Sequence, residues 1–271
     1  KVSKNTKAIL VTHLYGLACE MDKIQKFCNE KNIILIEDCA QAIGAEISGR
    51  KVGTFGDYSC FSFHAQKNLS TLGEGGMLVV NNEKKQYVKK LKHNGHEPFL
   101  DQNNYWEPAM VNVVRPFEDH WPYNFPLTEI QSAIGWKYLD RLDERNSLRK
   151  ERALRFIESL KGFPVSFQSG FDYSSNRHVW HLFPIKVEKN KTVRNKIINE
   201  LYEIHDIKCA LQFYPLYKYE LFKSNGYGNS SCPNLEEFYE KVFSIPFHVW
   251  MSSEEENYLI TCLKKVLSKY T

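Results

Sequence analysis

Two residues next to apolar runs have types suited to covalent catalysis, a lysine and an acid. Lys67 lies in a polar turn between residues 61–63 (FSF) and 77–80 (MLVV), which are expected to form strands. A lysine in such a turn can be partly desolvated, which lowers its pKa and makes its amine a nucleophile towards an aldehyde. For most lysines a solvated surface position is the simpler interpretation. A second motif upstream favours the catalytic one here.

The second motif is an acidic pair, Glu37 and Asp38, directly after the apolar run 33–36 (IILI). Such a run predicts a strand buried on both faces, as in parallel sheets. A carboxylate at the carboxyl end of a parallel strand lies where open α/β sheets bind ligands. Pyridoxal 5'-phosphate (PLP) requires a lysine for its Schiff base and an acid for its pyridinium nitrogen. We therefore predict PLP as the cofactor, with Lys67 and Asp38 as catalytic residues.

Three segments occur in one order at close spacing, at 37–42 (EDCAQA), 53–57 (GTFGD) and 61–76 (FSFHAQKNLSTLGEGG). Together they resemble the DegT/DnrJ/EryC1/StrS family of PLP-dependent sugar aminotransferases. The resemblance implies an α/β fold, the fold-type-I PLP-dependent transferase, with a mostly parallel sheet, helices and a smaller C-terminal α+β domain. Leu72 departs from the family pattern as an extra residue before the glycine-rich run. It should lengthen the turn without removing the lysine.

The resemblance also implies which residues bind the cofactor. Lys67 and Asp38 match the lysine and the acid of the family. Gln41 would pack or hydrogen-bond near the cofactor ring, and Ser62 would hydrogen-bond the cofactor phosphate. By residue type alone, Ser62 is equally expected to be a capping or ladder serine.

A further implied role belongs to Asn124, in the segment 123–125 (YNF). The matching asparagine of the family reaches the cofactor phosphate of the neighbouring subunit. A C2 homodimer with active sites shared between subunits is therefore expected. Pro126 stands where many family members have arginine, so a contact made by that arginine is not expected here.

The implied reaction moves an amino group from an amino acid, glutamate by resemblance, to a keto sugar carried on a nucleotide, as in amino sugar and polysaccharide biosynthesis. Other interpretations remain open. A PLP-dependent sugar dehydratase of the same fold has histidine in place of the lysine, which Lys67 disfavours. An inactive homologue acting as a binding protein should lack one of Lys67, Asp38 and Ser62, and all three are present. An inactive fragment that acts as a binding protein is the third alternative, and the presence of these residues does not decide against it. A Rossmann dehydrogenase needs G-x-G-x-x-G after a strand, whereas the glycines at 73–76 precede one.

Composition restricts the partners and the compartment. The chain has 271 residues and a net charge of +4, too mild to indicate a nucleic-acid partner. Its seven cysteines include no C-x-x-C pair, so neither zinc nor a disulfide framework is indicated. Free thiols suit a reducing cytoplasm. No signal peptide and no apolar run long enough to span a bilayer occur, so we expect no membrane partner and no metal.

The order of predicted elements gives the domains. Strands near 7–11 and 33–38 flank a helix at 21–28, which is a βαβ unit and implies a parallel sheet. His13 follows the first strand, and a strand-end histidine is more often structural than catalytic. We predict a PLP-binding large domain over residues 1–140.

Residues 141–271 are predicted to form a long connecting helix and the small C-terminal domain. The helix should begin after a capping box of Thr128 and Gln131 and continue to about Leu160. The chain begins at Lys1 and shows no Gly-Thr/Ser turn of the kind that holds the cofactor phosphate in the family. We therefore expect that the N-terminal part of the large domain is missing.

Overall fold

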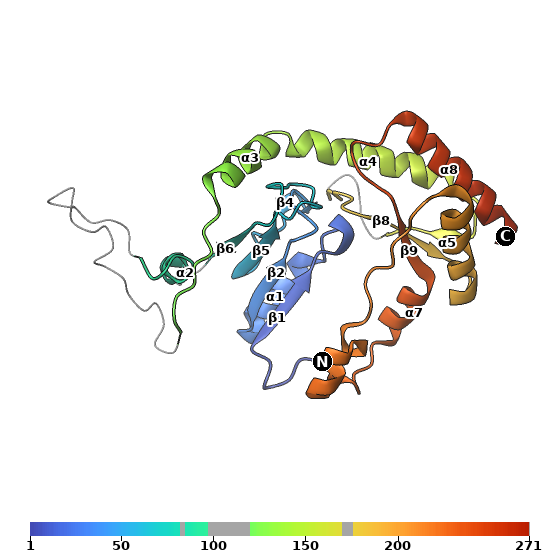
Figure 1. The fold of residues 1–271 in the computed structure, drawn as a ribbon. Helices are drawn as coiled ribbons and strands as arrows, with labels where there is room; N and C mark the ends of the chain where they lie inside the picture. The colour runs from blue at the N-terminus through green and yellow to red at the C-terminus, as the bar shows by residue number, and fades with distance from the viewer. Residues whose placement is uncertain (82–84, 97–119, 170–175, 271) are drawn as a thin grey trace. The chain divides into compact units, whose positions relative to one another are not determined.

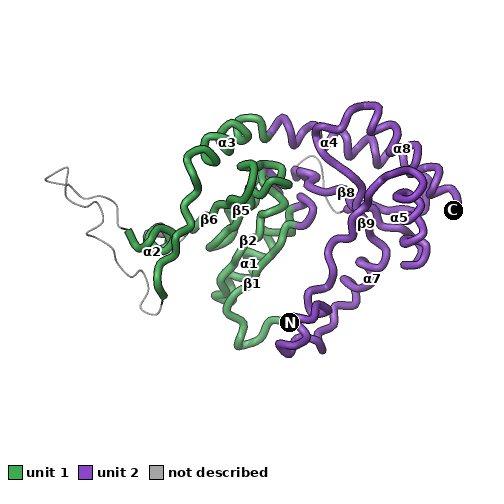
Figure 2. The backbone as a smooth tube through the Cα atoms, viewed as in Figure 1, with its two compact units in different colours: residues 1–13, 18–43, 49–142 green, residues 14–17, 44–48, 143–271 purple. Residues whose placement is uncertain are grey.

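The computed structural model describes residues 1–81, 85–96, 120–169 and 176–270 (Figure 1). They form two compact units, shown in different colours in Figure 2. Unit 1 comprises residues 1–13, 18–43 and 49–142, and unit 2 comprises residues 14–17, 44–48 and 143–271. Among the helices of the described residues, none has the length and apolar character needed to cross a bilayer.

Unit 1 is built on a four-stranded sheet with the order β1-β2-β5-β6. β1 and β2 are parallel, as are β2 and β5, whereas β6 is antiparallel to β5. The predicted βαβ unit is present, because α1 connects β1 to β2. The bounds are Ala8–Thr12 for β1, Met21–Lys31 for α1, Ile34–Asp38 for β2, Tyr58–Ser62 for β5 and Gly76–Val80 for β6.

The sheet has a buried face, which we call the inner face. Val11, Glu37 and Ser59 are paired across β1, β2 and β5, so their side chains lie on the same face. Leu35 shares this face with Glu37, and all four residues are buried. The inner face is therefore the packed side of unit 1.

The opposite, outer face carries Leu10, Ile34, Asp38, Cys60 and Ser62. Leu10 is 62% exposed and Ile34 is 41% exposed. The run 33–36 was predicted to be buried on both faces, and this prediction is wrong for the described residues. Burial alternates along β2 because the described packing lies against one face of the sheet.

The helix predicted from residue 128 to about Leu160 is two helices, α3 (Glu129–Leu139) and α4 (Leu142–Ser159). The predicted capping box of Thr128 and Gln131 is present at the start of α3. The helix breaks after Leu139, at an aspartate, which is a poor helix former. Residues 139–142 (LDRL) contain neither glycine nor proline, so no strong breaker signal in the sequence marks this position.

Unit 2 contains the larger apolar core. Its sheet is antiparallel with the order β7-β8-β9, formed by Val165–Ser166, Phe183–Val187 and Val242–Ile245. Phe156 of α4 and Ile185 of β8 are completely buried in this core. The main helices around it are α4, α5 (Lys191–His205), α7 (Pro233–Lys241) and α8 (Ser253–Leu267).

The remaining elements are short. Those of unit 1 are β4 (Arg50–Lys51) and α2 (Lys85–Leu91). Those of unit 2 are η1 (Leu14–Gly16), β3 (Glu46–Ile47), η2 (Leu216–Lys218), α6 (Glu220–Phe222), η3 (Lys223–Tyr227) and η4 (Ser268–Tyr270).

Candidate active site

Lys67 lies in a closed turn between β5 and β6. The two arms of the turn are joined by the Phe63 N–H, which donates to the Gly75 carbonyl at 2.7 Å, and by the Ala65 N–H, which donates to the Gly73 carbonyl at 2.8 Å. These bonds extend the β5–β6 pairing beyond the strands. The turn is therefore a defined structure that holds Lys67 at the end of the sheet.

The extra residue Leu72 lies at the far end of this turn. It has a φ of 57° and is 65% exposed. The preceding residue, Thr71, donates its backbone N–H to the Phe63 carbonyl at 3.0 Å. The turn therefore accommodates Leu72 at its surface, and Lys67 remains in the closed part.

The amine of Lys67 is suited to nucleophilic attack. The side chain is half-buried, and burial lowers the pKa of the amine, while the negative charge of Asp38 opposes that change. Its Nζ has no hydrogen bond or ion pair within the described part of the chain. A desolvated amine with no partner has more of its reactive neutral form near neutral pH than an exposed lysine has.

Asp38 ends β2 and is half-buried on the outer face. Its Oδ1 accepts the Ala40 N–H at 3.0 Å. Its charge acts on the amine of Lys67 and, like burial, raises the pKa of the Cys60 thiol. The structure therefore places Asp38 close enough to Lys67 for its charge to act on the amine.

Ser62 precedes Lys67 in the chain, and Gln41 follows Asp38. Ser62 ends β5 on the outer face, and its Oγ accepts the His64 N–H at 3.3 Å. Gln41 is half-buried in the turn that follows β2. The outer face offers a carboxylate and a hydroxyl, and the turn after β5 adds the Lys67 amine, a set of groups that fits PLP.

Asn124 lies apart from this group. It is exposed and forms an isolated antiparallel bridge with His93, and the neighbouring Phe125 N–H donates to the Lys92 carbonyl at 2.8 Å. No contact among the described residues joins Asn124 to Lys67 or Asp38. A role for Asn124 in its own chain's site has no support from these contacts.

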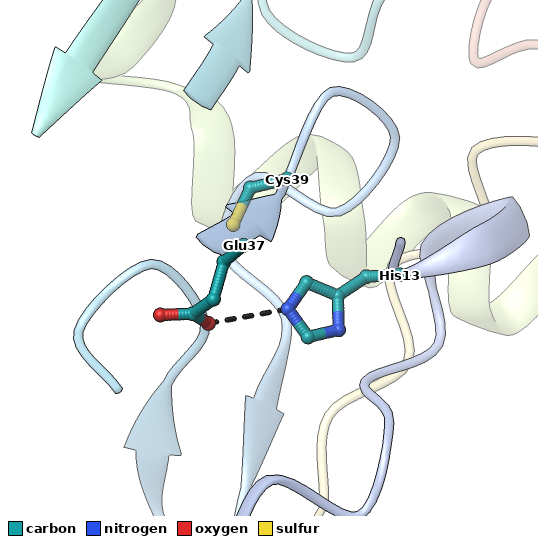
Figure 3. Close-up of side chains that lie close together, drawn as sticks. All are labelled: His13, Glu37 and Cys39. Atoms are coloured by element: carbon teal, nitrogen blue, oxygen red, sulfur yellow. Dashed lines mark hydrogen bonds and ion pairs between the residues drawn. The ribbon is translucent and has the colours of Figure 1, made fainter. Parts of the chain in front are cut away.

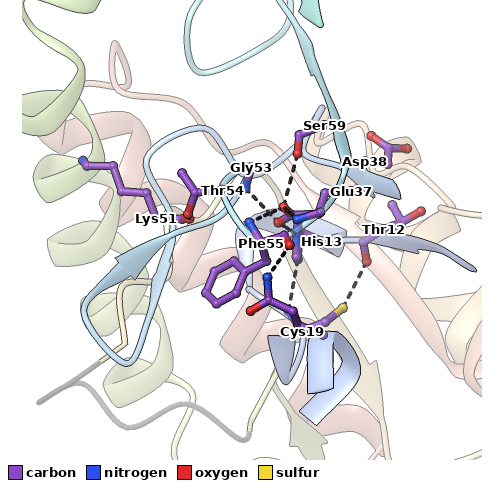
Figure 4. Close-up of polar contacts among 12 residues, drawn as sticks. Thr12, His13, Cys19, Glu37, Asp38, Lys51, Gly53, Thr54, Phe55 and Ser59 are labelled. Carbon is purple, nitrogen blue, oxygen red and sulfur yellow. Dashed lines mark hydrogen bonds and ion pairs between the residues drawn. The ribbon is translucent and has the colours of Figure 1, made fainter. Parts of the chain in front are cut away.

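Beneath Asp38, on the inner face, the carboxylate of Glu37 is surrounded by donors (Figure 4). Both oxygens accept backbone N–H groups of the 53–56 loop, and further donors are the Ser59 hydroxyl and the His13 ring. Burial disfavours the charge, but the bonds from His13 and the loop outweigh it and lower the pKa of Glu37 to about 2. Glu37 is therefore a buried, ionised and fully hydrogen-bonded carboxylate.

Ligand atoms of His13, Glu37 and Cys39 lie within 4.8 Å of one another (Figure 3). Burial and the charge of Glu37 raise the pKa of the Cys39 thiol, so it stays protonated. The His13 Nδ1 accepts the Cys19 N–H at 3.1 Å. His13 and Glu37 use these atoms in hydrogen bonds to each other and to backbone N–H groups, and the Cys39 thiol is protonated, so we interpret the three residues as part of the hydrogen-bonded core.

Sequence reasoning did not assign a role to Glu37 or to the 53–56 loop. The loop amides can reach Glu37 because residues 53 and 56 are glycines. Gly53 has a φ of 87°, and a Cβ there would lie 2.3 Å from the Phe61 ring. A Cβ at Gly56 would lie 2.8 Å from the Leu35 carbonyl oxygen. The glycine spacing in 53–57 (GTFGD), after an acidic pair, was the available signal.

Comparisons with known proteins identify the family of the chain. The sequence model described as the DegT/DnrJ/EryC1/StrS aminotransferase family matches residues 1–264. GDP-perosamine synthase of Vibrio cholerae is 27% identical, with 97% of this chain and 67% of that protein aligned. The dTDP-3-amino-3,6-dideoxy-alpha-D-galactopyranose transaminase of Aneurinibacillus thermoaerophilus is 30% identical, with 98% and 67% aligned. The chain thus spans about two thirds of the length of these relatives.

A solved structure is similar over the same extent. PseC of Helicobacter pylori, an aminotransferase involved in the biosynthesis of pseudoaminic acid, superimposes with a TM-score of 0.85 at 27% identity. The match covers 99% of this chain and 68% of PseC. It confirms the predicted fold-type-I α/β architecture. The chain belongs to the DegT/DnrJ/EryC1/StrS aminotransferase family.

Proposed function

We propose that this protein is a PLP-dependent aminotransferase that moves an amino group from an amino acid, glutamate in our proposal, to a keto sugar linked to a nucleotide. The observation that carries the proposal is the half-buried, unpaired amine of Lys67 beside Asp38 at the carboxyl end of a parallel strand. Two relatives are named GDP-perosamine synthase and dTDP-3-amino-3,6-dideoxy-alpha-D-galactopyranose transaminase, and these names support a nucleotide-linked sugar as the substrate class.

Each proposed site residue has a distinct task. Lys67 would hold the cofactor and then carry a proton on Nζ between the donor and the cofactor. Asp38 would hold the ring nitrogen, and Ser62 would hold the phosphate. When bound, PLP supplies an electron sink that stabilises a carbanion. Gln41 would contact the ring from the turn after β2.

The test is reduction of the PLP-loaded protein with borohydride, followed by digestion and mass spectrometry. We expect a pyridoxyl adduct on the peptide that contains Lys67, and none in Lys67→Ala or Lys67→Arg. Lys51→Ala is the matched control, because Lys51 is an exposed lysine on β4, and it should keep the adduct. An adduct that persists in Lys67→Ala would contradict the assignment.

We further propose a homodimer in which Asn124 completes the partner's site. Asn124 is exposed, and it follows Trp121, which is 75% exposed, in a segment that could contact a second chain. Mixing Lys67→Ala with Asn124→Ala subunits tests this. Hybrid dimers would contain one intact site, so an equal mixture should recover about one quarter of wild-type activity. Recovery of no activity would contradict a shared site.

Two broader proposals accompany the activity. We propose residues 1–140 as the cofactor-binding domain and 141–271 as a connecting helix with the small domain, since the two compact units divide near residue 142. We also propose a reducing compartment, the cytoplasm, because all seven cysteines are free thiols. Labelling with a thiol reagent after denaturation without a reductant would check that all seven cysteines are free thiols, because buried thiols do not react in the folded protein.

A further inference from the structure

We propose that Glu37 and His13 form a buried clamp that sets the position of the Asp38 carboxylate. Both clamp side chains are completely buried, so they are positioning residues and not catalytic ones. The inference rests on the proposed function and deepens it, because it assigns to the same site two residues that act through Asp38.

His13 holds the end of β2 in two ways. Its backbone N–H donates to the Asp38 carbonyl at 3.1 Å, and its Nε2 donates to Glu37 Oε2 at 3.2 Å. The Cys19 N–H occupies Nδ1, which leaves the ring hydrogen on Nε2 and fixes the ring's orientation. One residue therefore joins the backbone of Asp38 and the side chain of Glu37 to the end of β1.

Glu37 attaches the same strand end to the 53–56 loop. Its Oε1 accepts the Phe55 N–H at 2.8 Å and the Gly56 N–H at 2.6 Å, and its Oε2 accepts the Gly53 N–H at 2.8 Å. Hydrogen bonds to a charged acceptor are about twice as strong as neutral ones. The carboxyl end of β2 is thus held from the β1 side and from the loop.

Asp38 depends on this attachment. Consecutive strand residues point to opposite faces, so Glu37 points inwards and Asp38 outwards from adjoining Cα atoms (Figure 4). Within the described residues, the one hydrogen bond to the Asp38 carboxylate comes from the Ala40 N–H. Its position is therefore set mainly by the backbone, and the clamp fixes that backbone.

The first test measures the pH midpoint at which the absorbance of bound PLP titrates in the holoenzyme. The negative charge of Asp38 favours a protonated cationic form beside it, so Asp38→Asn lowers the midpoint. We expect Glu37→Gln and His13→Gln to lower it too, by a smaller amount. In an Asp38→Asn background neither should have any further effect. If Glu37→Gln shifts the midpoint as far in the Asp38→Asn background as in the wild type, the clamp is overturned. Glu37 would then act on the cofactor through its own charge and not through Asp38.

Asp57 provides the matched control. Its Oδ2 accepts the Leu35 N–H at 2.9 Å, so it holds β2 by the same kind of bond further from Asp38. Asp57→Asn should destabilise the protein and leave the midpoint unchanged. If it moves the midpoint as far as Glu37→Gln does, at equal loss of stability, the clamp is overturned. His13→Gln leaves the Glu37 carboxylate in place and carries the test if Glu37→Gln does not fold.

The second test uses the cofactor-free protein and hydrogen exchange. Glu37→Gln should speed exchange of the His13 N–H, the donor to Asp38, by about tenfold or more, as expected for loss of a charge-assisted hydrogen bond. Asp57→Asn should not. Unchanged exchange at His13 would overturn the clamp. Absence of a Lys67 adduct in the wild type would contradict the proposed function instead, and the exchange result would still decide the clamp.

Discussion

Glu37 and Asp38 are adjacent acids on one strand, and their surroundings differ completely. Glu37 faces the packed side of the sheet, is completely buried and accepts hydrogen bonds from a histidine, a serine and three backbone amides. Asp38 faces the open side, accepts one N–H and influences the amine of Lys67. One strand end therefore supplies a structural anchor, Glu37, and a group proposed for the chemistry, Asp38, because side chains alternate between the two faces of a strand.

The largest expected difference between the two acids is in turnover. Asp38→Asn should lower the turnover rate by about 10²–10³-fold, as for loss of a preorganised charge in an active site. Its free energy of unfolding should fall by less than about 1 kcal/mol, because one hydrogen bond to an N–H is weakened. Steady-state kinetics and urea unfolding of the same preparation measure both. A normal turnover rate would remove Asp38 from the site.

The second prediction is a large effect on stability at Glu37, where Asp38→Asn has a small one. Glu37→Gln should lower the free energy of unfolding by about 3 kcal/mol, because the amide replaces a charge that the loop N–H groups stabilise and sets an NH₂ against some of those donors. Urea unfolding measures it. A loss as small as that of Asp38→Asn would show that the two faces do not differ in the way described.

The third prediction concerns acid. The folded-state pKa of Glu37 is about 2, below its ordinary value of 4.5. Its contribution to stability is therefore complete above about pH 4.5 and is lost as the pH falls towards 2, by at most about 1.4 kcal/mol for each pH unit. The difference in unfolding free energy between wild type and Glu37→Gln should shrink over this range. A difference that stays constant from pH 5 to pH 2 would contradict an ionised Glu37.

The smallest predicted effect is at the loop. Gly53→Ala should cost about 1–3 kcal/mol beyond the backbone strain of its φ of 87°, because the new Cβ would meet the Phe61 ring. Gly49→Ala is the control: its φ is 74°, but its Cβ would meet nothing within 4 Å, so only the backbone strain of about 1 kcal/mol applies. Equal losses for both would mean that close packing at Gly53 does not matter.

Lys67 and Asp38 could be proposed as a reactive pair from the sequence because the signals are local. Lys67 and Asp38 each follow an apolar run, and strand ends display functional groups. The surroundings of Glu37 were not predictable in the same way, because most of its donors are backbone amides, which every residue type except proline provides. The break between α3 and α4 is not predictable from the sequence, because residues 139–142 contain neither glycine nor proline.

The alternation of side chains along β2 restricts how this strand can change during evolution or engineering. Deleting or inserting one residue in β2 before Glu37 would shift the register by one residue and turn each following side chain to the opposite face of the sheet. Glu37 would then point to the outer face and Asp38 to the inner face. Glu37 would lose its buried hydrogen-bond donors, and Asp38 would lose its position beside the amine of Lys67. The strand can therefore accept substitutions, but a change in its length should abolish activity, even where the neighbouring loop accepts a change in length.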